Sequence, residues 1–286
     1  MGGAMASRLL SAGYSLTIYA RNASKAQPFL SQGAHLADSP ATVAHACDIV
    51  FTMLGRAKDV RETVLSGNDC ILSGLKPNGS VLVDHTNSNS ELAKEIFAAA
   101  RKKNCWAVDA PVSGGDEGAR TGNMAIFAGG DSSVVNWLLP LLKILGNKVT
   151  YMGSAGSGHT CKMGSQIMVG ANLLGLSEGL VFSGQAGLDK ARWLEAVRHG
   201  GGGSRVEELF ARRIVDGDFR PGGFAEYLVK DLAMIVGFVE GANDEEVVVL
   251  PGTALFKELF TGLVAAGEGK LSAHAVINVI RRINGV

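Results

Sequence analysis

The strongest constraint on the fold of this chain is an alternation of short apolar runs with helical patterns over roughly its first half. The apolar runs, many of their residues β-branched, cover residues 16–19, 49–54, 81–84 and 107–110. Helical patterns separate one run from the next. Strands that alternate with helices in this way predict a mostly parallel sheet wrapped by helices. We therefore expect the first half to be an α/β domain.

Helix-start signals between the apolar runs support this interpretation. Ser39 precedes Pro40, the order of an N-cap and a proline in the first helical turn. Residues 88–91 read Ser-Asn-Ser-Glu, which is the spacing of a capping box. Asp131 precedes a helical pattern over residues 134–145 and can cap it.

The second half of the chain shows helical patterns only. A glycine-rich segment, residues 153–158, leads into a helical stretch from about residue 159 to 184, and further helical segments follow. At 286 residues the chain is long enough for two cores. We expect an α/β domain over residues 1–152 and an all-helical domain over 153–286. The first turns of its leading helix are the place to look for chemistry.

Charge, cysteine spacing and hydropathy exclude several classes of protein. Lys plus Arg and Asp plus Glu both total 27, so no overall field favours nucleic acid or an anionic membrane. The four cysteines lack the spacing of a metal site, and we expect none. The apolar stretch 167–182 contains Asn172, Glu178 and three glycines, which indicates a buried helix and no membrane span. No signal or transit peptide is visible at the start.

The first six residues, Met-Gly-Gly-Ala-Met-Ala, look like the second half of a G-x-G-x-x-G loop. In such loops glycines let backbone amides approach a pyrophosphate at the start of a helix. Only the last glycine can be present, as Gly2, and no strand signal precedes it in this sequence. We therefore expect a doubly wound sheet that lacks its first strand.

A polar turn after the first apolar run bears on the choice of cofactor. Arg21 lies 19 residues after Gly2, where dinucleotide folds place the group that reads the adenine ribose. Arg21, with Asn22 and Lys25 beside it, suits the 2′-phosphate of NADP, whereas Asp or Glu would suit NAD. We expect NADP or NAD to bind, with NADP favoured. A solvated surface turn is the alternative.

Residues 109–115, Asp-Ala-Pro-Val-Ser-Gly-Gly, place a hydroxyl and bare backbone amides directly after a strand. Adjacent glycines permit a carboxylate to approach N–H groups closely. Ser113, Gly114 and Gly115 therefore suit a small carboxylate substrate. An ordinary strand-to-loop turn is the alternative.

Two lysines are candidates for chemistry. Lys162 and Gln166 lie four residues apart, so they share one face of the predicted helix. A lysine that is partly buried in a cleft can exchange a proton with a hydroxyl or carbonyl oxygen, although most helical lysines are simply solvated. Lys230 can reach a cofactor or substrate, or pair with Asp231 or Glu226; the sequence leaves these alternatives open.

Four segments in this order resemble the β-hydroxyacid dehydrogenase family, and the resemblance covers essentially the whole chain. Residues 1–6 are similar to the end of its G-x-G-x-M-G-x-x-M-A signature, 109–115 to its D-A-P-V-S-G-G loop, 156–162 to its G-x-G-x-x-x-K segment and 230–232 to its K-D-L segment. The segments 127–130 and 187–189 also resemble plant proteins of the 3-hydroxyisobutyrate dehydrogenase-like type.

The resemblance implies a Rossmann domain followed by an all-α domain that forms a homo-oligomer. It implies that Lys162 is the general acid/base, that Ser113, Gly114 and Gly115 hold the substrate carboxylate with Gln166 nearby, and that the cofactor lies against Gly2, Met53, Leu54, Thr86 and Lys230. It also suggests a mitochondrial protein, with a cytoplasmic one as the alternative.

The chain departs from the family pattern at two site segments. The family commonly has Asn where this chain has Gln166, and it usually reads D-x-S-T where this chain has residues 84–87, Asp-His-Thr-Asn. Our leading hypothesis is an oxidoreductase that moves hydride between NADP(H) or NAD(H) and a small 3-hydroxyacid or semialdehyde such as 3-hydroxyisobutyrate. The alternatives are a truncated, non-catalytic relative that folds or dimerises through its helical domain but binds cofactor poorly, and a reductase acting on another substrate such as an imine.

Overall fold

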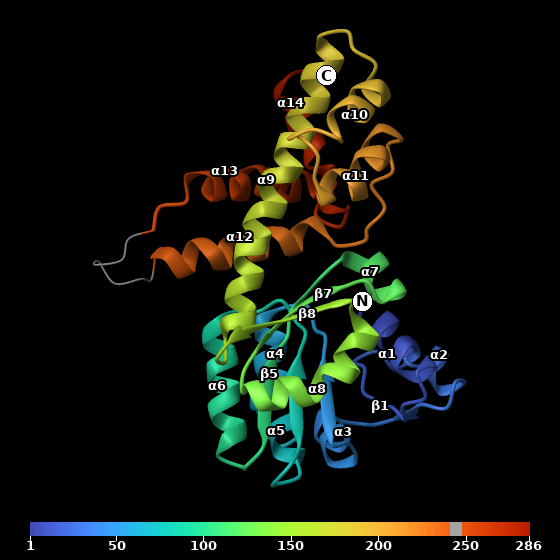
Figure 1. Cartoon of the computed structure of the whole chain (residues 1–286), viewed down its shortest axis with the longest axis vertical. Helices are drawn as coiled ribbons and strands as arrows, with labels where there is room; N and C mark the ends of the chain where they lie inside the picture. Colours follow the sequence, from blue (N-terminus) through green and yellow to red (C-terminus); the bar gives the residue numbers. More distant parts are fainter. Residues whose placement is uncertain (241–247) are drawn as a thin grey trace. The chain divides into compact units, whose positions relative to one another are not determined.

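Residues 1–240 and 248–286 are described by the structure, a computed structural model, and they divide into two units, Met1–Lys162 and Met163–Val286 (Figure 1). The division falls inside the helix α9 (Ser157–Gln185), whereas the sequence places the boundary before this helix, at residue 152. The first unit alternates strands and helices, and the second is helical.

The elements of the first unit follow the alternation predicted from the sequence, with strand bounds shifted by up to two residues. In chain order they are α1 (Gly2–Ser11), β1 (Thr17–Ile18), η1 (Ala23–Lys25), α2 (Gln27–Leu30), β2 (His35–Leu36), α3 (Pro40–Ala46), β3 (Ile49–Thr52), α4 (Ala57–Leu65), α5 (Ile71–Gly74), β4 (Val81–Asp84), α6 (Ser90–Arg101), β5 (Trp106–Asp109), β6 (Val112–Ser113), α7 (Gly115–Thr121), β7 (Ala125–Gly129), α8 (Ser132–Leu145) and β8 (Lys148–Gly153).

The strands form two sheets. The larger has the order β3-β4-β5-β7-β6, with β8 paired to β7, and the smaller consists of β1 and β2. Strands β3, β4 and β5 run parallel, while β7 is antiparallel to β5 and β6. Since β3 ends the order, its outer edge has no ladder partner among residues 1–240 and 248–286. This agrees with a doubly wound sheet that lacks its first strand.

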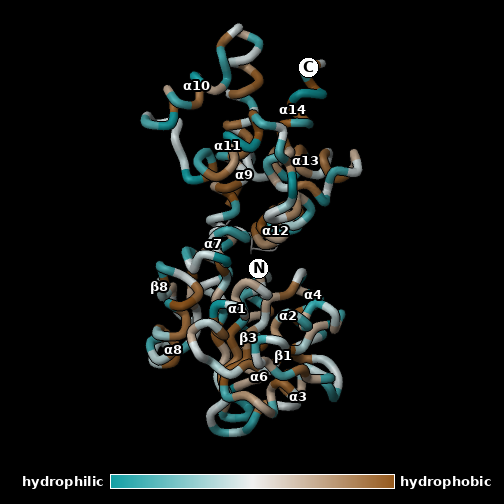
Figure 2. The backbone as a smooth tube through the Cα atoms, turned by 90° about the vertical axis from the view of Figure 1, so that its right-hand side faces the viewer, coloured by the Kyte–Doolittle hydropathy of each residue, from teal (hydrophilic) through white to brown (hydrophobic). Residues whose placement is uncertain are grey.

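Two hydrophobic clusters cover the two faces of the larger sheet. In β4, Val81 and Val83 belong to a cluster with α1 and α8, whereas Leu82 belongs to a cluster with helices α3 to α6. Successive side chains of a strand point to opposite faces, so this division follows from the pleat. Burial on both faces is typical of parallel strands and accounts for the apolar run of β4, whose four residues are all buried. The neighbouring β3 is also largely apolar (Figure 2), although its residues alternate between partly and fully buried.

The helix starts are close to the predicted ones. Ser39 accepts a hydrogen bond from the amide of Thr42 and caps α3, as predicted. Asp131 caps α8, which begins at Ser132, two residues before the predicted start. The prediction for residues 88–91 was off by one position, because Asn89 caps α6 by accepting from Leu92 N.

The second unit contains the rest of α9 and shorter helices. These are α10 (Lys190–Val197), α11 (Arg205–Val215), α12 (Ala225–Glu240), α13 (Pro251–Leu263), η2 (Val264–Glu268), η3 (Ala273–Val276) and α14 (Ile277–Ile283). Within the described residues, α9 is the one helix whose length and composition would suffice to cross a membrane. Its Leu173 and Leu180 lie in the cores of the unit, which is the pattern of a core helix.

We predict that Leu142→Ala destabilises the first unit. Leu142 is fully buried in the cluster between the sheet and α8, so truncation leaves a cavity and lowers the free energy of unfolding by about 2–5 kcal/mol. Urea unfolding measures this change. The neighbouring exposed Lys143 provides the control, since Lys143→Ala should leave stability within about 0.5 kcal/mol; equal stability of both variants would contradict the core assignment.

Candidate active site

Three polar side chains end three neighbouring parallel strands. Thr52 pairs in register with Asp84, and Asp84 with Asp109, so the three lie side by side at the carboxyl edge of the sheet. The Asp84 Oδ1 accepts from the Thr52 hydroxyl at 2.6 Å and from the amide of Thr86 at 3.0 Å. In open α/β sheets this edge is where ligands bind.

The residues predicted to line the nicotinamide are brought together at this edge. The amide of Leu54 donates to the Thr86 hydroxyl at 2.9 Å, which joins the segments that follow β3 and β4. A methyl group placed on Gly2 would lie 3.4 Å from Met53 Cβ, so α1 begins directly against the end of β3. The start of α1 has no side-chain cap, and its first amides are therefore suited to a diphosphate.

The predicted ribose-binding turn is on the surface. The Arg21 side chain is 75% exposed, and its Nη1 lies 3.2 Å from Oδ1 of Asp59 in α4. Asn22 uses its side-chain oxygen to cap η1 by accepting from Ser24 N at 3.1 Å. Lys25 is also exposed. The turn therefore presents two cations to solvent beside the start of α4.

The predicted carboxylate loop has a backbone that only glycine adopts readily. Ser113 ends β6, is partly exposed and pairs with Ala125 of β7. Gly114 and Gly115 have φ angles of 144° and 64°, in the left-handed range. A methyl group on Gly114 would also lie 3.3 Å from Met124 Cα. The glycines are required by this turn, which leads from Ser113 into α7.

The start of α9 is docked on the sheet through Asp109. Its Oδ1 accepts from the amide of Gly156 at 2.8 Å, and its Oδ2 from the amide of His159 at 3.0 Å. A methyl group on Gly158 would overlap the carbonyl oxygens of Phe127 and Asp109, so the approach requires glycine. Lys162 follows one turn later in α9 and is 7% exposed. The docking thus places Lys162 close to the carboxyl edge of the sheet.

Buried charges surround this docking contact. Burial raises the pKa of the Asp109 carboxyl, although the charge of His159 and the two amides act against it. Burial also acts to raise the pKa of Asp84, but the adjacent His159 imidazole and the hydrogen bonds from Thr52 and Thr86 outweigh it and hold that pKa below its ordinary value. Burial lowers the pKa of the His85 imidazole, which hydrogen-bonds the Ala110 carbonyl through Nδ1.

Two further predicted residues meet at a carboxylate in the second unit. Gln166 Nε2 donates to Asp231 Oδ2 at 2.8 Å, and Lys230 Nζ lies 3.1 Å from Asp231 Oδ1. Asp231 is buried. Of the two carboxylates that the sequence offered to Lys230, the structure pairs it with Asp231, whereas Glu226 pairs with Lys270.

Sequence reasoning missed most of the contacts that hold the candidate residues. Asp59 and Asp109 were not singled out as partners, and Asp231 was considered as a partner of Lys230 but not of Gln166. The signal was present for Asp109, because it ends a strand in the same position as Asp84. The family motifs also contain Asp109 and Asp231 as flanking letters.

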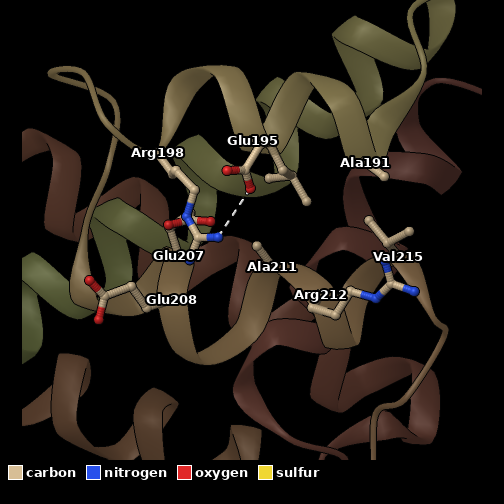
Figure 3. Close-up of a pocket in the computed structure, with 9 residues that line it drawn as sticks. Ala191, Glu195, Arg198, Glu207, Glu208, Ala211, Arg212 and Val215 are labelled. Carbon is tan, nitrogen blue, oxygen red and sulfur yellow. Dashed lines mark hydrogen bonds and ion pairs between the residues drawn. The ribbon is translucent and has the colours of Figure 1, made fainter.

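A pocket in the second unit lies between α10 and α11, and Figure 3 shows its polar lining. There Arg198 Nη1 donates to Glu195 Oε2 at 3.2 Å. None of the residues predicted for the site lines this pocket. Within residues 1–240 and 248–286, no group of three or more His, Cys, Asp or Glu side chains is arranged to hold a metal ion.

Comparison with known families covers both units. Residues 1–153 match the NAD binding domain of 6-phosphogluconate dehydrogenase, and residues 156–280 match the NAD-binding domain of NADP-dependent 3-hydroxyisobutyrate dehydrogenase. The uncapped start of α1 beside Gly2 and the strand ends at Thr52 and Asp84 fit such a dinucleotide.

Individual relatives agree with the family matches. A probable 3-hydroxyisobutyrate dehydrogenase-like 3, mitochondrial, of Arabidopsis thaliana is 54% identical over 100% of this chain and 86% of its own length. The 2-hydroxy-3-oxopropionate reductase of Escherichia coli is 32% identical over 98% of this chain and 94% of its own. The crystal structure of 3-hydroxyisobutyrate dehydrogenase from Salmonella typhimurium superposes with a TM-score of 0.86 at 28% identity, covering 97% of this chain and 95% of that one.

We predict opposite effects of alanine at two glycines of α9. Gly158→Ala forces a methyl group against the strand carbonyls and should destabilise the protein by about 1–3 kcal/mol. Gly164, on the same helix, has no neighbour within 4 Å of an added methyl group, so Gly164→Ala should stabilise by about 0.5–1 kcal/mol. Thermal unfolding compares them. A Gly158→Ala protein as stable as the unaltered one would show that the docking contact is not tight.

Proposed function

The chain belongs to the β-hydroxyacid dehydrogenase family of NAD(P)-dependent oxidoreductases, and from this premise we propose that it interconverts a small 3-hydroxyacid and its semialdehyde, with NADP(H) as cofactor. The observation that carries the proposal is Lys162, nearly buried one turn into a helix that Asp109 docks at the carboxyl edge of the sheet. 3-Hydroxyisobutyrate is the first substrate to test.

The first unit supplies the cofactor contacts. When bound, the nicotinamide accepts or gives the hydride. The first amides of α1, from Gly2 onward, would hold its diphosphate, and the strand-end segments joined by the Leu54–Thr86 hydrogen bond would line the nicotinamide. Arg21 and Lys25 are exposed cations suited to a 2′-phosphate, which supports NADP over NAD.

Lys162 handles the hydroxyl proton in this proposal. In the oxidative direction its amine takes the proton from the substrate hydroxyl, and in the reductive direction its ammonium returns it to the oxygen. Its burial keeps bulk water from competing for that proton.

The substrate carboxylate is held by the Ser113 hydroxyl and the amides of Gly114 and Gly115. These groups stand on a turn fixed by its glycine backbone, so they are oriented before substrate binds. For Gln166 and Lys230 the assignment to substrate and cofactor follows the family motifs; within the second unit both contact Asp231.

We also propose a mitochondrial location and a homo-oligomer formed through the helical unit. The Arabidopsis relative carries the word mitochondrial in its name, which supports the first proposal. Organelle fractionation of the native protein and light scattering of the purified one test the two proposals.

We predict that Lys162→Ala lowers kcat by about 10²–10⁴-fold, because the proton transfer loses its catalyst. NADPH affinity, measured by fluorescence titration, should change less than about threefold, since Lys162 is assigned to the substrate proton. The exposed Lys143→Ala is the control and should keep the unaltered kcat. Absence of cofactor-dependent absorbance change with any of a panel of 3-hydroxyacids and short semialdehydes would refute the proposed reaction for the unaltered protein.

We predict that Arg21→Ala raises the KM for NADP(H) by about 10–100-fold, the cost of losing a charged hydrogen bond to phosphate. The KM for NAD(H), which lacks the 2′-phosphate, should stay within about threefold. Steady-state kinetics with both cofactors measures the difference. Equal effects on the two cofactors would indicate that Arg21 does not read the 2′-phosphate.

A further inference from the structure

One buried group near Lys162 has no part in the reaction described above. The His159 side chain is fully buried in the first turn of α9, and its Nε2 lies 3.8 Å from Asp84 Oδ2. Its backbone amide donates to Asp109 Oδ2. The His159 ring therefore faces Asp84 at the end of β4, while its backbone is bound by Asp109 at the end of β5.

The burial of this imidazole is costly unless the ring is paired. Among the described residues, neither ring nitrogen of His159 has a hydrogen-bond partner, and Asp84 Oδ2 has none either. Buried polar groups normally have partners, because losing water without compensation is unfavourable. The His159 Nε2 lies 3.8 Å from Asp84 Oδ2, so pairing of the imidazole with this carboxylate is the compensation that the site offers.

A chain of short contacts runs outward from Asp84. Its other oxygen holds the Thr86 amide, and the Thr86 hydroxyl accepts from the Leu54 amide. His159 itself lies in α9, three residues before Lys162. Its imidazole thus connects the helix turn assigned to the substrate proton with the segments assigned to the nicotinamide, through Asp84.

We propose that His159 is a positioning residue whose pairing with Asp84 sets the start of α9, and with it Lys162, relative to the Thr86–Leu54 segment. This inference rests on the proposed function of Lys162. The ring does not touch the reacting atoms. The His159–Asp84 pair joins the start of α9 to the end of β4. Lys162 and the segment assigned to the nicotinamide therefore keep their mutual orientation.

The proposal predicts an effect on turnover that exceeds the effect on substrate binding. A misplacement of about 1 Å can cost about 100-fold in rate, so His159→Leu should lower kcat by about 10–100-fold. The carboxylate loop at Ser113 is outside this chain of contacts, and the KM for the hydroxyacid should change less than about threefold. His159→Gln, which keeps a hydrogen-bond donor, should retain more of kcat than His159→Leu.

The matched control is His274, a second fully buried histidine, which lies between Phe210 and Phe219 in the second unit. His274→Leu should lower the unfolding temperature and leave kcat within about threefold, because it removes a buried imidazole far along the chain from Lys162. Equal kcat losses in His159→Leu and His274→Leu would overturn the proposal by assigning His159 an ordinary structural role.

Hydrogen exchange tests the coupling without using activity. In His159→Leu, peptides containing the Leu54 amide and peptides containing the Gly156 amide should both exchange faster than in the unaltered protein, and in His274→Leu neither should.

A double variant tests the pairing by stability. Asp84→Asn combined with His159→Leu should unfold at a higher temperature than His159→Leu alone, because the unpaired buried charge of Asp84 is gone. Faster exchange at Gly156 alone, or an unfolding temperature of the double variant below that of His159→Leu, would contradict the pairing of His159 with Asp84. Lack of turnover by the unaltered protein would refute the proposed reaction but would leave these two readouts to decide the pairing.

Discussion

The Asp109 carboxylate accepts hydrogen bonds from two backbone amides at the start of α9, and the rest of the candidate site depends on this contact. Asp109 ends a buried parallel strand, so its position is fixed by the sheet. Its two oxygens satisfy amides that a helix start leaves without intrahelical partners. Gly158 then allows the helix to approach the strand carbonyls. A loop-borne lysine at the same place would lack this support.

Register explains why polar groups meet here. Thr52, Asp84 and Asp109 end three strands at equivalent positions, so the strand register alone brings their side chains to one edge of the sheet. The edge is also where α1 begins, against Met53. The sheet therefore positions the first amides of α1, the strand-end carboxylates and Lys162 within the same unit, while Gln166 and Lys230 both contact Asp231 in the second unit.

Much of the fold of the first unit and several residues of the candidate site were predictable from the sequence. Periodicity located β1, β3, β4 and β5, and cap signals located the starts of α3, α6 and α8 to within two residues, whereas β2, β6, β7 and β8 were not predicted. Motif letters pointed to Lys162, Ser113 and Thr86. The antiparallel pairing of β7 was not predictable, because short strands carry no signal for direction. Nor was the burial of His159 against Asp84, since residues 75 positions apart meet only through the strand register and the docking of α9. The role of Asp231 likewise needed three-dimensional pairing.

In the proposed reaction Lys162 reaches the hydroxyl of a small hydroxyacid while the Ser113 turn holds its carboxylate. A crystal structure of the protein with NADP⁺ and 3-hydroxyisobutyrate would show both contacts. We expect Lys162 Nζ to lie within hydrogen-bond distance, about 2.6–3.2 Å, of the substrate hydroxyl oxygen. A bound substrate whose hydroxyl faces another proton donor, with Lys162 outside that range, would contradict it.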